Sequence, residues 1–198
     1  CGPHRPARAV RGLEQGRLDA AGDADHRPDR ELAEGESATG PGWTLTALAT
    51  PGHTMNHLAF AFAEEDALFS GDHVMAWSTS IVAPPDGAMG PYMASLEKLR
   101  GRSETVYWPG HGGPVRDPQR FVRGLLGHRR AREAGILERV SAGERTIPGL
   151  VAALYSGLDP MLRPAAALSV FAHLEDLVER GRIATDGPPA LDSEYRPA

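Results

Sequence analysis

Apolar and polar side chains alternate through the middle of the chain with the period of two that is typical of β-strands. Apolar side chains alternate with threonines over most of residues 43–49 and predict a strand there, which a Pro-Gly pair ends. Short apolar runs predict further strands over residues 58–62, 67–70 and 105–108. The near-helical spacing of three apolar side chains predicts a helix over residues 91–99.

After residue 118 the apolar positions follow the 3.6-residue period of amphipathic helices. They predict a long helix whose opposite side is rich in arginines, Arg129 among them, and a second helix capped by Thr146. A third helix is predicted over residues 164–180, with Gly181 as a left-handed C-terminal cap. Residues 182–185 follow as a brief strand. The second half of the chain is therefore expected to be mainly helical.

Composition narrows the class of protein. With 198 residues, 41% hydrophobic and 24% charged, the chain suits a globular core with a small appended domain. The net charge of −5 gives no reason to expect nucleic acid as the main partner. The single cysteine, Cys1, excludes an internal disulfide and favours a reducing, cytoplasmic location. No apolar run reaches the roughly 18–20 residues of a membrane span, so no membrane partner is expected.

The start of the chain is unusual. It begins with Cys-Gly-Pro-His rather than methionine, and aliphatic side chains are scarce over residues 1–42. We expect mostly loop there, with a short helix over residues 8–18. The near absence of lysine favours a GC-rich, bacterial source, and we expect the chain to be a piece of a longer reading frame.

Three loops share one design, in which a glycine precedes a metal-capable side chain just past a predicted strand. Strand ends are rigid and let such side chains converge, while glycine lets the backbone bend and keeps bulk away. A single Pro-Gly-His is a surface turn more often than a site, but three loops in the order His, Asp, His favour a metal site. The loops are Thr50-Pro51-Gly52-His53-Thr54, Ser70-Gly71-Asp72-His73 and Trp108-Pro109-Gly110-His111-Gly112-Gly113.

The donor types indicate the chemistry. Imidazole and carboxylate suit zinc and similar divalent metals. An aspartate can bridge two ions, and a bridged pair lowers the pKa of a shared water until it is hydroxide near neutral pH. Such a hydroxide attacks an ester, thioester, amide or phosphodiester.

The same loops resemble the third, fourth and fifth motifs of the metallo-β-lactamase superfamily. The run from His53 to His57 and residues 81–87 and 92–96 resemble one branch, the lactamase-β-like hydrolases. That branch includes a mitochondrial endoribonuclease and ends in a small winged-helix domain. The resemblance implies an α/β fold: part of an αββα sandwich over residues 1–118 and a winged-helix-like domain over residues 119–187. The sequence after these domains, residues 188–198, is expected to be a disordered tail.

The resemblance also implies roles for the three donors. His53 would complete the first metal site, Asp72 would bridge both ions and act in catalysis, and His111 would belong to the second site. The family's other ligands come from a His-x-His-x-Asp-His motif, which this sequence lacks. We therefore expect two zinc ions in an intact parent and weak or partial zinc binding by this chain.

Other candidates are weaker. Residues 23–26, Asp-Ala-Asp-His, have suitable side chains without a preceding strand, and Cys1 and His4 belong to an end where a disordered terminus is the simpler interpretation. Thr54, His57 and His73 flank the ligands and would either support them or serve structure, with structure slightly favoured for the two histidines. His128 and His173 lie on helical faces and are interpreted as packing or boundary residues.

Three functions follow in decreasing order of preference. The first is a zinc-dependent hydrolase of a small-molecule or phosphodiester substrate, impaired in this chain alone. The second is a non-catalytic binding or regulatory remnant of the fold. The third is a nucleic-acid module, which is disfavoured because the last two helices show no basic excess. We also expect the chain alone to expose sheet edges and core and to aggregate.

Overall fold

The computed structural model describes residues 30–198. Of these, residues 31–198 form one compact unit. A five-stranded sheet holds its strands in chain order, with antiparallel neighbours up to the fourth strand and a parallel fifth. Its strands are β1 (Ser37–Gly40), β2 (Trp43–Ala49), β3 (Leu58–Phe62), β4 (Ala67–Gly71) and β5 (Val106–Pro109).

The parallel step from β4 to β5 requires a crossover, which contains helix α1 (Met89–Arg100). The four strands and the helix that the sequence predicts are confirmed with small shifts at their ends. The expectation of loop was wrong over β1, which pairs with β2 through a tight turn at Pro41-Gly42. Gly42 has a φ of +79°, which a side chain would disfavour.

One face of the sheet packs against helices, whereas the other face exposes aromatic side chains. On one face Leu48, Ala59, Leu68 and Tyr107 pack in a core with side chains of α1 and of the next helix, α2 (Pro118–Ser141). On the other face aromatic side chains lie side by side, because Phe60 pairs with Phe69 and Phe69 with Trp108 in the strand register. Phe69 is 41% exposed and Trp108 44% exposed. We call this second face, with Leu45, Phe60, Phe62, Phe69 and Trp108, the aromatic face.

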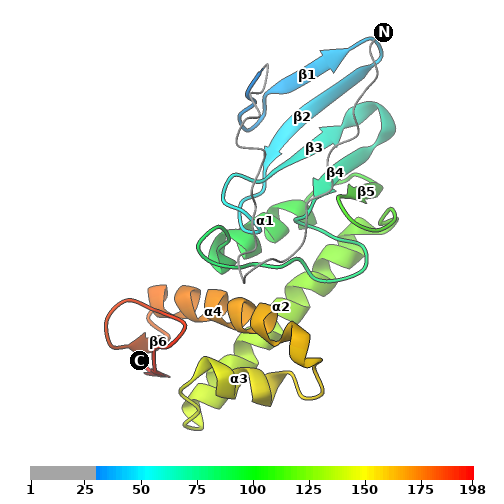
Figure 1. Cartoon of the computed structure of the whole chain (residues 1–198). Helices are drawn as coiled ribbons and strands as arrows, with labels where there is room; N and C mark the ends of the chain where they lie inside the picture. Colours follow the sequence, from blue (N-terminus) through cyan, green and yellow to red (C-terminus); the bar gives the residue numbers. More distant parts are fainter. Residues whose placement is uncertain (1–29) are drawn as a thin grey trace. The chain divides into compact units, whose positions relative to one another are not determined.

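The helical part follows β5. Helix α2 runs from the sheet to α3 (Ile147–Leu154) and α4 (Arg163–Glu179), as Figure 1 shows. It packs in both cores, since Val122 and Leu126 join the sheet core while Ile136 and Val140 join the helical one. Two 3-10 turns, η1 (Ala63–Glu65) and η2 (Pro160–Leu162), complete the helices of the described part.

Both predicted helix caps are confirmed. The Thr146 hydroxyl accepts a hydrogen bond from the Gly149 amide at the start of α3. Gly181, which follows α4, has a φ of +64°. The brief strand predicted after it is β6 (Ile183–Thr185).

Two expectations for the helical part were wrong. The tail over residues 188–198 is ordered, because β7 (Tyr195–Pro197) pairs with β6 and the Tyr195 ring is fully buried. The Tyr195 hydroxyl also donates to the Ala190 carbonyl at 2.7 Å. Arg129, expected on the solvent side of the long helix, is only 3% exposed.

Some predictions lie outside the described residues. These are the short helix over residues 8–18 and the candidate donors Cys1, His4 and residues 23–26. Within residues 30–198, no helix is long and apolar enough to cross a membrane. The domain boundaries at residues 118 and 187 stay a prediction.

Candidate metal centre

The three predicted ligands meet at one edge of the sheet. The His53 Nε2 atom lies 3.8 Å from one Asp72 carboxylate oxygen, and the His111 Nε2 atom lies 3.6 Å from the other. The strand directions explain this, because β2, β4 and β5 all run the same way and their carboxyl ends share an edge. Each ligand follows one of these strands by one to four residues, as counted along the sequence.

His53 has a fixed ring orientation. Its Nδ1 atom lies 2.6 Å from the Ile81 carbonyl oxygen, which can only accept a hydrogen bond. The proton is therefore on Nδ1, and the lone pair of Nε2 faces Asp72. Metal-binding histidines commonly show this arrangement, in which one nitrogen donates to a carbonyl and the other is left for the metal.

Asp72 carries the polar atom that a metal would satisfy. Its Oδ1 atom is buried and has no hydrogen-bond partner within the described part of the chain. A buried carboxylate oxygen without a partner is unfavourable by about 1–3 kcal/mol or more. A cation between Asp72 and His111 would remove that penalty.

The number of ligating side chains limits how well the site can hold a metal ion. Residues 30–198 contain no group of three or more His, Cys, Asp or Glu side chains that could hold one metal ion. The donors instead form two pairs, His53 with Asp72 and His111 with Asp72. Each pair offers an ion two ligands, which is half of a four-coordinate set.

His57 supports the loop that carries Asp72. Its Nε2 atom accepts a hydrogen bond from the Asp72 amide at 3.2 Å, so the proton is on Nδ1, which donates to the Thr50 hydroxyl at 2.8 Å. Burial is the main cause that lowers the His57 pKa to about 4, and the nearby His53 adds to it while Asp72 opposes it. The ring is therefore neutral at physiological pH and available for both bonds.

His73 and Thr54 contact the site mainly through their backbone. The His73 carbonyl accepts hydrogen bonds from the Ser80 hydroxyl at 2.9 Å and the Tyr92 hydroxyl at 3.2 Å. The His73 ring is buried against the Tyr92 ring, and neither of its nitrogens has a partner among residues 30–198. Burial lowers the pKa of His73 to about 3. The Thr54 carbonyl accepts from the amides of Gly52 and His57.

Two glycines leave room for these side chains. A Cβ atom on Gly71 would lie 2.6 Å from the His57 Nε2 atom, and Gly71 also has a φ of +52°. A Cβ atom on Gly110 would lie 2.5 Å from the Asp72 Oδ1 atom. Both distances are below normal contact, so glycine is required for the observed positions of His57 and Asp72.

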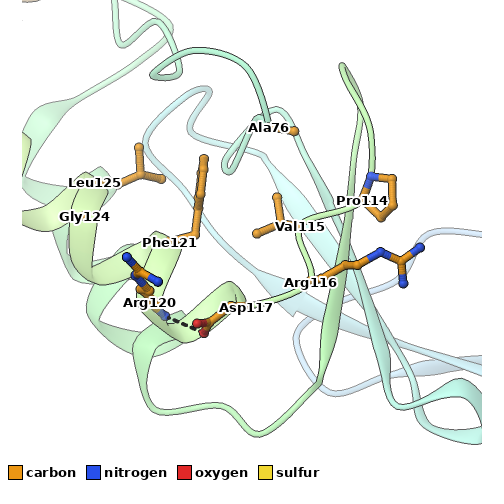
Figure 2. A pocket seen from close by; sticks show the side chains of 9 residues that line it. All are labelled: Ala76, Pro114, Val115, Arg116, Asp117, Arg120, Phe121, Gly124 and Leu125. Atoms are coloured by element: carbon orange, nitrogen blue, oxygen red, sulfur yellow. Dashed lines mark hydrogen bonds between the residues drawn. The ribbon is translucent and has the colours of Figure 1, made fainter.

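A hollow lies next to the loop that carries His111. Ala76, on its wall, donates a backbone hydrogen bond to the His111 carbonyl at 3.4 Å. Figure 2 shows Val115, Phe121 and Leu125 around it, with the Asp117 carboxylate bonded to the Arg120 amide. Its volume is about 530 Å³, and its lining consists of Ala76, Pro114, Val115, Arg116, Asp117, Arg120, Phe121, Gly124 and Leu125.

Comparison with known families identifies the fold. The family model described as "Metallo-beta-lactamase superfamily" matches residues 2–111, which is more than half of the chain. The chain belongs to this superfamily. A second model, "Beta-lactamase associated winged helix domain", matches residues 146–188. This member of the metallo-beta-lactamase superfamily therefore combines the two folds that its sequence resembles.

Curated relatives and solved structures agree. The chain is 31% identical over 166 residues to an atrochrysone carboxyl ACP thioesterase of Aspergillus terreus, with 76% of this chain and 48% of the relative covered. It is 30% identical over 167 residues to a beta-lactamase-like protein 2 homolog of Drosophila melanogaster, with 83% and 55% covered. The chain spans about half the length of these relatives.

Among solved structures, a metallo-beta-lactamase family protein of Thermus thermophilus superimposes with a TM-score of 0.71 at 29% identity, covering 87% of this chain and 55% of that one. A beta-lactamase domain protein of Burkholderia ambifaria superimposes with a TM-score of 0.78 at 22% identity, covering 89% and 54%. The second likeness shows the fold alone.

Several contacts that support the candidate metal centre were not predicted from the sequence. The Ile81 carbonyl, the Ser80 hydroxyl and the Tyr92 hydroxyl hold the ligand loops, whereas the sequence indicated Ile81 and Tyr92 only as parts of stretches that resemble one branch of the superfamily. A backbone carbonyl is present at every residue, so no residue type could have indicated Ile81. Tyr92 was predicted as an apolar position of the helix and as part of a stretch that resembles that branch, but not as a hydrogen-bond donor.

Gly110→Ala is expected to weaken zinc binding by roughly 10-fold or more while the chain stays folded. The added methyl group would displace the Asp72 carboxylate, and Gly110 has no positive φ that would add backbone strain. Gly113→Ala is the control in the same loop, since a Cβ atom there meets nothing within 4 Å. Competition with a zinc chelator measures both, and equal affinities would contradict the steric role.

Proposed function

We propose that the chain carries part of the active site of a zinc-dependent hydrolase. The supporting observation is Asp72, whose carboxylate faces the Nε2 atoms of two histidines and keeps a buried oxygen without a partner in the described part. When bound, zinc would act as a Lewis acid and activate water for attack on an ester, thioester, amide or phosphodiester. His53, Asp72 and His111 would hold the metal.

The residues of the chain prepare these donors. The Ile81 carbonyl keeps the His53 lone pair on Nε2, the atom that faces Asp72. The neutral His57 ring accepts from the Asp72 amide and fixes the start of that loop. Such preorganisation lets ligands bind an ion with little rearrangement.

A thioester is the substrate class that we favour. The Aspergillus terreus relative and one from Emericella nidulans are both named atrochrysone carboxyl ACP thioesterases. The hollow next to the loop that carries His111 would suit the acyl part of such a substrate, because Val115, Phe121 and Leu125 give it an apolar wall. Arg116 and Arg120 would attract an anionic group on the same substrate.

The test is hydrolysis of four substrates with zinc present: an acyl thioester, an aryl ester, a β-lactam amide and an aryl phosphodiester. It is run on the chain itself. Asp72→Asn is expected to lower kcat/KM by roughly 100-fold or more, because it removes the charge that the two metal positions share. Asp192→Asn is the matched control, since Asp192 is an exposed carboxylate elsewhere in the chain.

Unchanged turnover in Asp72→Asn would reject the role of that carboxylate. A second candidate function is a non-catalytic binding or regulatory protein. Its support is that the described donors form pairs rather than a group of three. Absence of hydrolysis of all four substrates, together with less than one zinc ion per chain, would favour this second function.

A further inference from the structure

Arg129 is a buried cation on helix α2. Its side chain is 3% exposed and forms no ion pair with any residue from 30 to 198. Burying a charge without a counter-ion is unfavourable unless hydrogen bonds compensate. Arg129 therefore depends on the neutral groups around it, and its contacts show what those groups are.

Those contacts come from three other segments. One terminal nitrogen of Arg129 donates to the Ser80 carbonyl, in the loop that follows Asp72. The other donates to the Ser169 hydroxyl of α4 at 3.1 Å. The guanidinium also lies over the Tyr92 ring of α1, 5.3 Å from its centroid. Arg129 thus joins both long helices of the helical part to the loop of the metal centre.

Ser80 and the residue after it connect Arg129 to two of the candidate ligands. Its hydroxyl donates to the His73 carbonyl at 2.9 Å, and His73 directly follows Asp72. The next residue, Ile81, accepts the Nδ1 proton of His53 at 2.6 Å. The Tyr92 hydroxyl donates to the same His73 carbonyl at 3.2 Å. Arg129 therefore holds Ser80, and the atoms that support His53 and Asp72 belong to Ser80 itself or to its neighbour Ile81.

We propose that Arg129 is a positioning residue for the metal ligands. By holding the Ser80 carbonyl, it places the Ile81 carbonyl against His53 and the Ser80 hydroxyl against the backbone beside Asp72. Ser169 anchors it from α4, so the helical part fixes the geometry of the metal centre. The proposal rests on the proposed function, because it treats His53 and Asp72 as ligands.

Arg132 is a matched control on the same helix. It also donates to a backbone carbonyl, that of Leu154 at 2.8 Å, and its guanidinium lies 3.8 Å from the centroid of the Tyr155 ring. Both arginines thus make one carbonyl bond and one aromatic contact. The partners of Arg132 belong to α3 and its end, and they lead to no ligand. A general effect of losing a helix-packing arginine should therefore appear in both positions.

The first experiment determines the tautomer of His53 in the metal-free chain. Long-range proton–nitrogen NMR spectra at about pH 8 show which ring nitrogen of a neutral histidine carries the proton. The wild-type chain and Arg132→Met are expected to show the proton of His53 on Nδ1. Arg129→Met is expected to show a mixture of both tautomers, because the Ile81 carbonyl is no longer held in place.

The second experiment measures zinc affinity by chelator competition in the same proteins. Arg129→Met is expected to weaken binding about 10-fold, as the loss of a group that orients a ligand commonly does. Arg129→Lys is expected to recover part of the affinity, since its ammonium can still donate to the Ser80 carbonyl. Arg132→Met is expected to stay within about 2-fold of the wild type.

The outcomes separate the two proposals. A His53 tautomer that responds to Arg129→Met but not to Arg132→Met supports the positioning role, even if the wild-type chain binds no zinc and the proposed function fails. Equal responses in both variants, or none in either, would overturn it. If circular dichroism shows Arg129→Met to be unfolded, Ser169→Ala decides, because it removes the anchor of Arg129 on α4, and an unchanged His53 in that variant would overturn the proposal.

Discussion

A variant that combines Phe69→Thr and Trp108→Thr is expected to stay monomeric at concentrations at which the wild-type chain self-associates. The two side chains are neighbours in the strand register and lie on the aromatic face, where each is about two-fifths exposed. Contiguous exposed apolar surface of this kind drives association in water. Threonine keeps the β-propensity of these positions while it removes most of the apolar area.

Light scattering with gel filtration over a concentration series measures this effect. Trp77→Thr is the control, because Trp77 is 72% exposed but lies in a loop outside the five strands. Its removal is expected to leave the association unchanged. A wild-type chain that remains monomeric throughout the series would contradict the prediction, as would an equal improvement from the Trp77 variant.

Acidification is expected to destabilise the chain through His173. This side chain is 1% exposed, and neither ring nitrogen has a partner in the part that the structure describes. Burial is the main cause that lowers its pKa to about 3, and Arg129, Arg132, Arg180 and His128 act in the same direction. In the unfolded chain a histidine has a pKa near 6.5.

These two pKa values set the direction in which stability changes with pH. Below about pH 6.5 the unfolded chain takes up a proton that the folded chain does not accept until near pH 3, so stability is lost as the pH falls through this range. Between pH 6.5 and 5 the loss from His173 is about 2 kcal/mol. His73 is also buried with a pKa lowered to about 3 and adds to it in the same direction.

His173→Leu isolates this contribution. Leucine leaves no polar partner unsatisfied, because the imidazole has none in the described structure. Between pH 6.5 and 5 the free energy of unfolding of the variant is expected to rise by about 2 kcal/mol relative to that of the wild type. Urea unfolding followed by circular dichroism measures it, preferably in the Phe69→Thr, Trp108→Thr background. Parallel pH dependences of the two proteins would reject the explanation.

The sequence pattern predicted the strands that their own apolar and polar side chains define. Strand β2 has the bounds that alternation predicts, and β3 has the bounds of the apolar run that predicted it. The edge strands β1 and β7 were missed, since Ser37–Gly40 has weak β-propensity and Tyr195–Pro197 is ordered by its pairing with β6. Their order comes from partners elsewhere in the chain, which a local pattern does not contain.

The site shows the same division. His53, Asp72 and His111 follow strand ends in a recognisable loop design and meet in the structure as expected. Arg129 was missed because periodicity counts arginine as a polar position. Yet it lies four residues after Leu125 and seven after Val122, both buried, so the buried stripe of α2 passes through it. An arginine in register with an apolar stripe is the signal that was available.

Helix α2 has a consequence for how such domains are exchanged between proteins. The winged-helix match begins at residue 146, yet Ile136 and Val140 of α2 complete the core of α3 and α4. A gene fusion that joined at residue 146 would transfer a module with an open core. One that joined at Pro118 would carry the whole helix, together with Val122 and Leu126, whose partners are in the sheet. A fusion at Pro118 would therefore need a recipient sheet that packs against Val122 and Leu126.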